Sequence, residues 1–123
     1  MDKMTKNEML VILPSRGRPE QAKRFYELFR KNSIISDICF GLDNDEYKSY
    51  GVEKEIIYSV NENMKLCPKL NVLANQFVNK YKYICFTGDD VSINTYGWDA
   101  QLLEPLKKQK SKKIITGLIL DHP

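Results

Sequence analysis

Two adjacent carboxylates, Asp89 and Asp90, follow an apolar run of strand length at 83–87 and a glycine, Gly88. Carboxylates at the carboxyl end of a buried strand lie where open α/β sheets bind ligands. Side by side, they offer oxygen ligands to a hard divalent cation such as Mn²⁺ or Mg²⁺. The residues also fit a plain strand-to-helix turn, because Gly and Asp favour turns and Asp caps helices.

Two further polar clusters, at 14–18 and 43–45, also follow strand-like apolar runs. In a parallel sheet the carboxyl ends of all strands meet at one edge, which is the usual place for a ligand crevice. Each cluster alone could be a turn. Together with the aspartate pair, they favour a binding site built from separate parts of the chain.

The residue types in these clusters indicate a phosphorylated ligand. Arg16 and Arg18 can offer forked donors to phosphate oxygens, and the start of the following helix would add backbone N–H groups and its positive dipole. Asp43 or Asp45 can accept a hydrogen bond from a ribose hydroxyl or a base N–H. The first loop matches neither the dinucleotide fingerprint nor the P-loop, so we expect a nucleotide diphosphate held with a metal.

The elements that would position these clusters alternate between strand-length apolar runs and stretches of helical period, which predicts an α/β fold with a mostly parallel sheet. The expected strands are 9–13, 38–42, 55–60, 83–87 and 114–120. The expected helices are 20–31, 68–81 and a shorter one from Trp98, in which Pro105 should cause a kink or an early end.

Composition bounds the remaining possibilities. With 123 residues, 42% of them hydrophobic and 28% charged, the chain fits a single domain over residues 1–123. No apolar run approaches the roughly 20 residues of a membrane span, and the charged start lacks a signal core, so we expect a cytoplasmic protein.

The net charge of +3 and the lysine run at 107–113 indicate a solvated helix end rather than a nucleic-acid surface. Three cysteines without a C-x-x-C pair indicate buried free thiols.

Several of these segments resemble the N-terminal, nucleotide-sugar-binding half of GT-A-fold glycosyltransferases, especially family-2-like enzymes. Residues 11–19 look like their opening strand and Pro-[Ser/Thr] loop, and 40–45 like their second strand with its terminal aspartate. Residues 86–90 fall where the D-x-D metal motif belongs. The string from Gly88 through Thr95 to Asp99 is similar to a Gly-Asp-Asp…Thr-x-Gly-Trp-Asp variant of some bacterial and phage-type members.

The resemblance implies a Rossmann-like three-layer GT-A sandwich, truncated after about five strands, that binds a nucleotide-diphosphate sugar with Mn²⁺ or Mg²⁺. It implies a metal site at Asp90 and Asp89, in which Asp90 is the direct ligand and Asp89 touches either ribose or a metal-bound water. Trp98 and Asp99 could meet the sugar, or instead pack and start the third helix. The implied nucleotide-binding residues are Pro14, Ser15, Arg16, Arg18, Asp43, Asp45 and Asp89.

Two departures from the family pattern leave alternatives open. Gly88 stands where the first D-x-D carboxylate belongs, which points to weak metal affinity. The acceptor half and the usual catalytic carboxylate would follow the fifth strand, so the acceptor and the general base are unassigned, with Asp121 only a remote candidate for the base. A non-catalytic nucleotide-binding module is therefore the second hypothesis, and a homodimer could cover the sheet edge. Tyr47 and Tyr50 could stack on a base or be surface aromatics.

Overall fold

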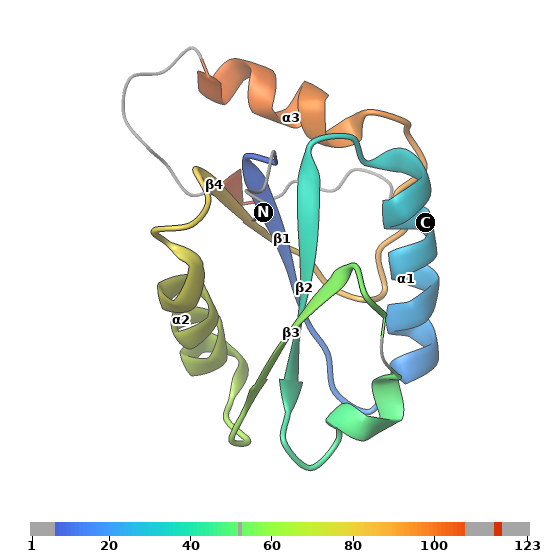
Figure 1. Ribbon diagram of the computed structural model, residues 1–123, viewed down its shortest axis with the longest axis vertical. Coiled ribbons are helices and arrows are strands. Elements are labelled where there is room, and N and C mark those ends of the chain that lie inside the picture. Colours follow the sequence, from blue (N-terminus) through green and yellow to red (C-terminus); the bar gives the residue numbers. More distant parts are fainter. Residues whose placement is uncertain (1–6, 52, 108–114, 117–123) are drawn as a thin grey trace.

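A computed structural model describes residues 7–51, 53–107 and 115–116, and its helices and strands alternate as the sequence predicts. The elements are β1 (Met9–Pro14), α1 (Pro19–Asn32), β2 (Ser36–Asp43), the 3₁₀ helix η1 (Tyr47–Tyr50), β3 (Ile56–Asn61), α2 (Leu66–Phe77), β4 (Tyr83–Phe86), α3 (Trp98–Lys107) and β5 (Ile115–Thr116) (Figure 1). The predicted α/β class is confirmed.

The strands form one parallel sheet in the order β3-β2-β1-β4-β5. The chain moves outward from β1 to β2 and β3, then crosses back through α2 to β4 on the other side of β1. This reversal is a topological switch point, where the loops that follow β1 and β4 separate and leave a crevice. The fold is therefore Rossmann-like. Its switch point lies between the polar cluster at 14–18, which follows β1, and the aspartate pair at 89–90, which follows β4.

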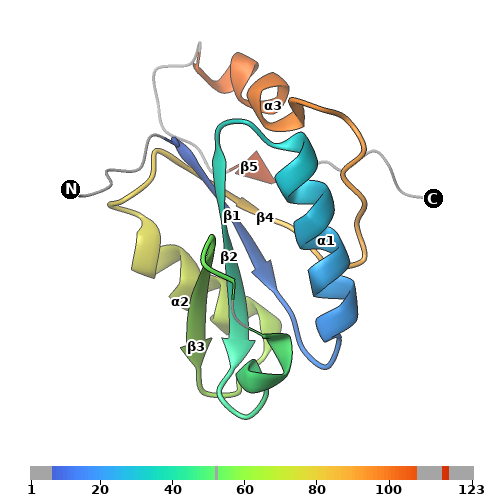
Figure 2. The same ribbon diagram turned by 45° about the vertical axis from the view of Figure 1, so that its right-hand side comes forward.

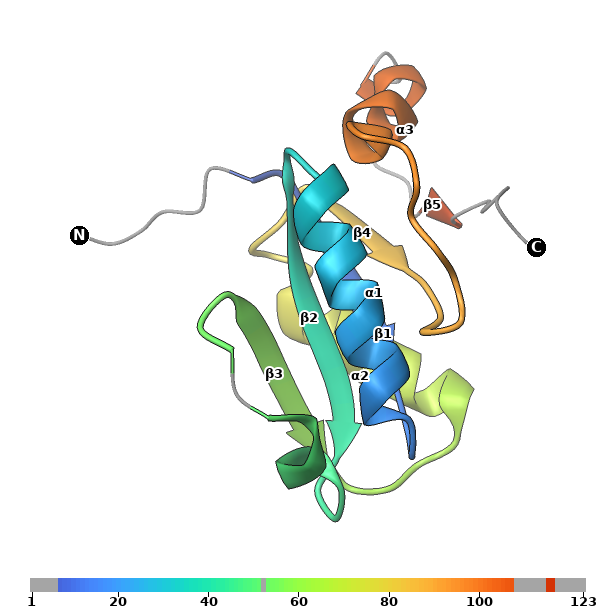
Figure 3. The same ribbon diagram turned by 90° about the vertical axis from the view of Figure 1, so that its right-hand side faces the viewer.

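Helices cover both faces of the sheet and make three layers (Figures 2 and 3). Successive residues of a strand point to opposite faces, and β1 shows this clearly: Val11 and Leu13 belong to the core under α1, whereas Leu10 and Ile12 belong to the core under α2. Leu103 of α3 joins the α1 core. All of β1 from Met9 to Leu13 is fully buried, as expected for a central strand covered on both sides.

Among the described residues, the elements that differ most from the sequence prediction are helices α2 and α3. Helix α2 begins at Leu66 and ends at Phe77, where the N–H groups of Lys80 and Tyr81 both turn back to the Phe77 carbonyl. Helix α3 continues to Lys107 with Pro105 inside it. Only Ile115–Thr116 of the predicted fifth strand is described, so the rest of that strand and Asp121 lie outside the described residues. The lysine run beyond Lys107 does so too.

Helix α2 packs closely on β2 because of a glycine. A Cβ atom on Gly41 would lie 2.6 Å from Cδ1 and 3.2 Å from Cδ2 of Leu73, a residue with no exposed surface. The absent side chain therefore sets the distance between α2 and the sheet.

We predict that Gly41→Ala destabilises the fold by about 1–3 kcal/mol, because the added methyl group overpacks the contact with Leu73. Urea unfolding monitored by circular dichroism measures this. The same change in a Leu73→Val background, which lacks both Cδ atoms, should cost clearly less. Equal costs in the two backgrounds would contradict a steric origin.

The described cysteines agree with the prediction of buried free thiols for Cys39 and Cys85, whereas Cys67 is exposed. Burial raises the pKa of Cys39 to about 12 and that of Cys85 to about 11.

No helix among the described residues is long and apolar enough to cross a bilayer.

We predict that one thiol per native chain reacts quickly with a chromogenic disulfide reagent near pH 8. The thiolate is the reactive species, and the raised pKa values of Cys39 and Cys85 keep both protonated at that pH. All three thiols should react after denaturation, and Cys67→Ser should remove the fast phase. Three equally fast thiols in the native protein would contradict the buried positions.

Candidate functional site

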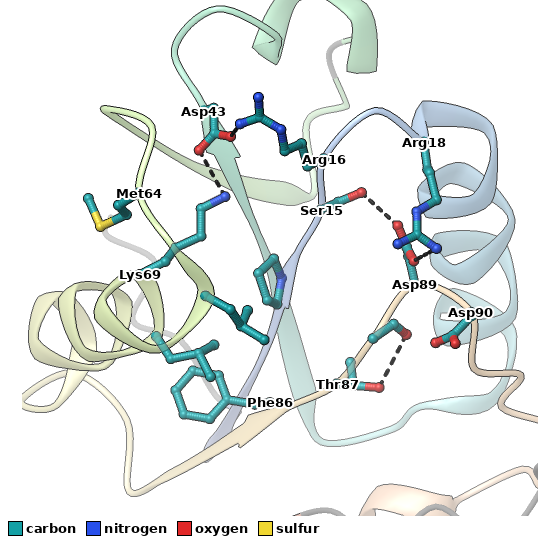
Figure 4. A pocket seen from close by; sticks show the side chains of 14 residues that line it. Ser15, Arg16, Arg18, Asp43, Met64, Lys69, Phe86, Thr87, Asp89 and Asp90 are labelled. Carbon is teal, nitrogen blue, oxygen red and sulfur yellow. Dashed lines mark hydrogen bonds and ion pairs between the residues drawn. The ribbon is translucent and has the colours of Figure 1, made fainter.

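A pocket of about 460 Å³ lies at the carboxyl ends of β1, β2 and β4 and is closed on one side by the first turns of α2 (Figure 4). Its position is the switch-point crevice predicted from the three polar clusters. The lining residues are Pro14, Ser15, Arg16, Arg18, Asp43, Met64, Leu66, Lys69, Leu70, Phe86, Thr87, Gly88, Asp89 and Asp90.

Asp43 ends β2 between two cations. Arg16 Nη1 donates to Asp43 Oδ2 at 2.5 Å, and Lys69 Nζ lies 2.9 Å from Oδ1. The second contact is an ion pair without aligned hydrogen-bond geometry. The carboxylate is 1% exposed and Lys69 6%, so the buried lysine charge depends on Asp43, and the buried carboxylate is compensated by both cations. The hydrogen bond and charge of Asp43 raise the pKa of Arg16 above its ordinary value.

Lys69 was missed by sequence reasoning, although the helix carried a signal. Lys69, Leu73 and Phe77 are the buried residues of α2, spaced four apart on one stripe. A lysine on an apolar stripe is rarely buried unless it is paired, so its position called for a carboxylate partner on the sheet.

The loop between β1 and α1 is held by the segment that follows β2. Gly17, in a left-handed conformation with φ 70°, donates its N–H to Glu46 Oε1 at 2.6 Å. The N–H of Arg18 donates to the Tyr50 hydroxyl at 3.2 Å. Helix α1 then begins with Pro19, which has no N–H. The N–H groups of Gly17 and Arg18 are therefore already bonded within the chain, whereas these contacts do not involve the N–H groups in the first turn of α1, which the sequence expectation assigned to a phosphate.

The two carboxylates of the Gly-Asp-Asp turn have different surroundings. Asp89 is buried; its Oδ2 accepts a hydrogen bond from Ser15 Oγ at 2.8 Å, and its Oδ1 lies 3.6 Å from Arg18 Nη1. Asp90 is exposed and makes no hydrogen bond or ion pair with other described residues. Asp89 is therefore anchored, and Asp90 is the carboxylate available to a ligand.

Trp98 and Asp99 are not brought to this pocket. Asp99 is fully buried, and its oxygens accept hydrogen bonds from the N–H groups of Ile34 and Ile35 and from Ser36 Oγ, at 2.6–3.1 Å. Trp98 Nε1 donates to a serine hydroxyl in the same turn at 2.8 Å. These bonds join α3 to the amino end of β2, at the opposite end of the sheet from the pocket (Figure 1). These contacts fit the alternative in which Trp98 and Asp99 pack and start the third helix and do not meet a sugar.

Two other expected contacts also lie off the pocket lining. Asp45 is exposed and its Oδ2 accepts a hydrogen bond from Asn63 at 3.4 Å. Tyr47 is 40% exposed on η1. Tyr50, by contrast, is bonded to Ser15, which does line the pocket.

No protein-family model matches the chain, and no curated protein matches it at a significant level. A functional assignment therefore depends on the chemistry of the pocket.

We predict that Asp99→Asn lowers the free energy of unfolding by about 1.5–3 kcal/mol, the usual contribution of hydrogen bonds to a charged group. The amide would present an N–H group to backbone N–H groups that can only donate, and of the Asp99 partners only the Ser36 hydroxyl could rotate to accept from it. Chemical denaturation measures the loss, and Asp45→Asn, at an exposed acid, is the control and should change little. A stable Asp99→Asn protein would contradict the structural role.

Proposed function

We propose that this pocket binds a nucleotide-diphosphate sugar together with a divalent cation, and that the domain belongs to sugar-transfer chemistry of the GT-A type. The observation that carries the proposal is the meeting of three basic and three acidic side chains in one pocket at the switch point. They are Arg16, Arg18, Lys69, Asp43, Asp89 and Asp90.

The charge balance of the pocket supports a ligand that carries both negative and positive charge. The basic and acidic side chains of the lining cancel formally. A diphosphate esterified at both ends carries one negative charge on each phosphate, and a divalent cation balances both. Binding the two together leaves the pocket neutral, whereas a free polyanion would leave its charge uncompensated in a half-enclosed site.

The metal donors fit an ion shared with the ligand. The described residues contain no cluster of three or more His, Cys, Asp or Glu side chains that could hold a metal alone. Mg²⁺ and related ions are commonly bound by one or two carboxylates and complete their coordination with water and substrate phosphates. Asp90 would be the direct ligand, and Asp89 would contact ribose or a metal-bound water. The bound ion would act as a Lewis acid on the departing diphosphate.

The rest of the lining suits a nucleobase. Pro14, Met64, Leu66, Leu70 and Phe86 give the pocket an apolar wall beside Lys69 and Asp43. Ligand pockets are mostly apolar with a few placed polar groups, and volumes of about 300–1,000 Å³ are typical. A planar base could lie on this wall while the diphosphate extends toward the loop that follows β4.

We predict that calorimetric titration with UDP-, GDP- and CDP-sugars detects Mn²⁺-dependent binding of at least one of them. Asp90→Asn should weaken that binding by about tenfold or more when Mn²⁺ is present, since it removes the direct metal ligand. It should change little in excess chelator. Asp45→Asn, an exposed acid outside the pocket, is the matched control. No heat from any donor, or unchanged affinity in Asp90→Asn, would count against the proposal.

Binding without transfer is the second candidate, and one observation favours it. Asp43 is paired with two cations, Asp89 is bonded to Ser15, and Asp90 is assigned to the metal. None of these lining carboxylates is left to deprotonate an acceptor hydroxyl. Release of free sugar from the donor, lost in Asp90→Asn, would support transfer chemistry; tight binding without turnover would support a binding module.

A further inference from the structure

A closed ring of polar contacts starts and ends at Arg18. The backbone N–H of Arg18 contacts the Tyr50 hydroxyl at 3.2 Å, and that hydroxyl lies 2.9 Å from Ser15 Oγ. Ser15 Oγ lies 2.8 Å from Asp89 Oδ2. The other carboxylate oxygen lies 3.6 Å from the Arg18 guanidinium. Figure 4 shows the Ser15–Asp89–Arg18 part of the ring on the pocket wall opposite Lys69.

Donor chemistry fixes the direction of each hydrogen bond in this ring. An amide N–H can only donate, so the Tyr50 oxygen accepts from Arg18. An ionised carboxylate can only accept, so Ser15 gives its single proton to Asp89. Tyr50 must then donate to Ser15. The chain runs from amide to tyrosine to serine to carboxylate, and each hydroxyl both accepts and donates, an arrangement in which hydrogen bonds strengthen one another.

The ring gives Asp89 a fixed orientation. Because Oδ2 is held by Ser15, Oδ1 is the oxygen that faces Arg18. Tyr50 itself is held by an edge contact with Phe40, with ring centroids 6.3 Å apart, and it packs against the core under α1. The hydroxyl is thus presented from a fixed ring, although Tyr50 does not line the pocket.

We infer that Tyr50 is a positioning residue for the ligand site: through Ser15 it orients the Asp89 carboxylate, and it thereby couples η1 to the pocket. The inference rests on the proposed function for its effect on nucleotide-sugar binding. The orientation of Asp89 itself can be measured without a ligand. Tyr50→Phe is the sharpest variant, because it removes the hydroxyl and keeps the ring that contacts Phe40.

The first measurement uses the free protein. In ¹⁵N- and ¹³C-labelled protein, Tyr50→Phe should shift the Arg18 amide proton and speed its hydrogen exchange, because that N–H loses its acceptor. It should also shift the Asp89 carboxyl ¹³C resonance, because Asp89 is connected to the Tyr50 hydroxyl by two successive hydrogen bonds through Ser15. Tyr47→Phe, which alters an exposed tyrosine of the same 3₁₀ helix, is the control and should leave both signals unchanged. An unchanged Asp89 resonance in Tyr50→Phe would overturn the inference.

The second measurement is a double-mutant cycle on nucleotide-sugar affinity in Mn²⁺. We predict that Tyr50→Phe and Ser15→Ala each weaken binding about three- to tenfold, and that the double variant is no weaker than Ser15→Ala, because both break one chain. The melting temperature of Tyr50→Phe should stay within a few degrees of the parent. Additive losses, or a loss matched by unfolding, would also overturn the inference. If the parent protein binds no nucleotide sugar, the proposed function fails, and the carboxyl resonance still decides the role of Tyr50.

Discussion

The parallel pairing of β1 with β2 on one side and with β4 on the other is the constraint on which the pocket depends. Parallel pairing brings the carboxyl ends of the three strands to one edge, and the change of direction after β1 separates the loops that follow β1 and β4. The complete burial of Met9 to Leu13 in β1 makes this register costly to change, since a shift by one residue would move each side chain to the opposite face of the sheet.

The buried carboxylates on the two walls of the pocket are compensated by different partners. On the α2 side, one carboxylate is compensated by two cations, and the helix supplies the deeper of them. On the β4 side, Asp89 is held by a serine hydroxyl and by a more distant arginine. The exposed Asp90 has no such contacts among the described residues. The loops around the two adjacent aspartates therefore give them different surroundings. Asp89 is anchored, and Asp90 is available to a ligand.

The sequence predicted the order of the elements and the meeting of the three clusters, because apolar runs and strand ends are local features with one topological outcome. It could not place Trp98 and Asp99. They follow the aspartate pair closely, but the intervening chain runs along the molecule to the amino end of β2, and an extended chain covers roughly 3.3 Å per residue. Proximity in a motif therefore gave a false impression of proximity in space. Lys69 was not assigned to the site, and Tyr50 was considered only as a base-stacking or surface aromatic, because their partners, Asp43 and Ser15, belong to other elements.

The close contact between Gly41 and Leu73 has a consequence for the shape of the pocket. Leu73 lies one turn after Lys69 on the same buried stripe of α2, so the depth at which the helix settles on β2 also sets how far the lysine amine reaches toward Asp43. Evolution could enlarge or narrow the cavity by altering the bulk at this helix–strand contact, without exchanging any side chain on the cavity wall.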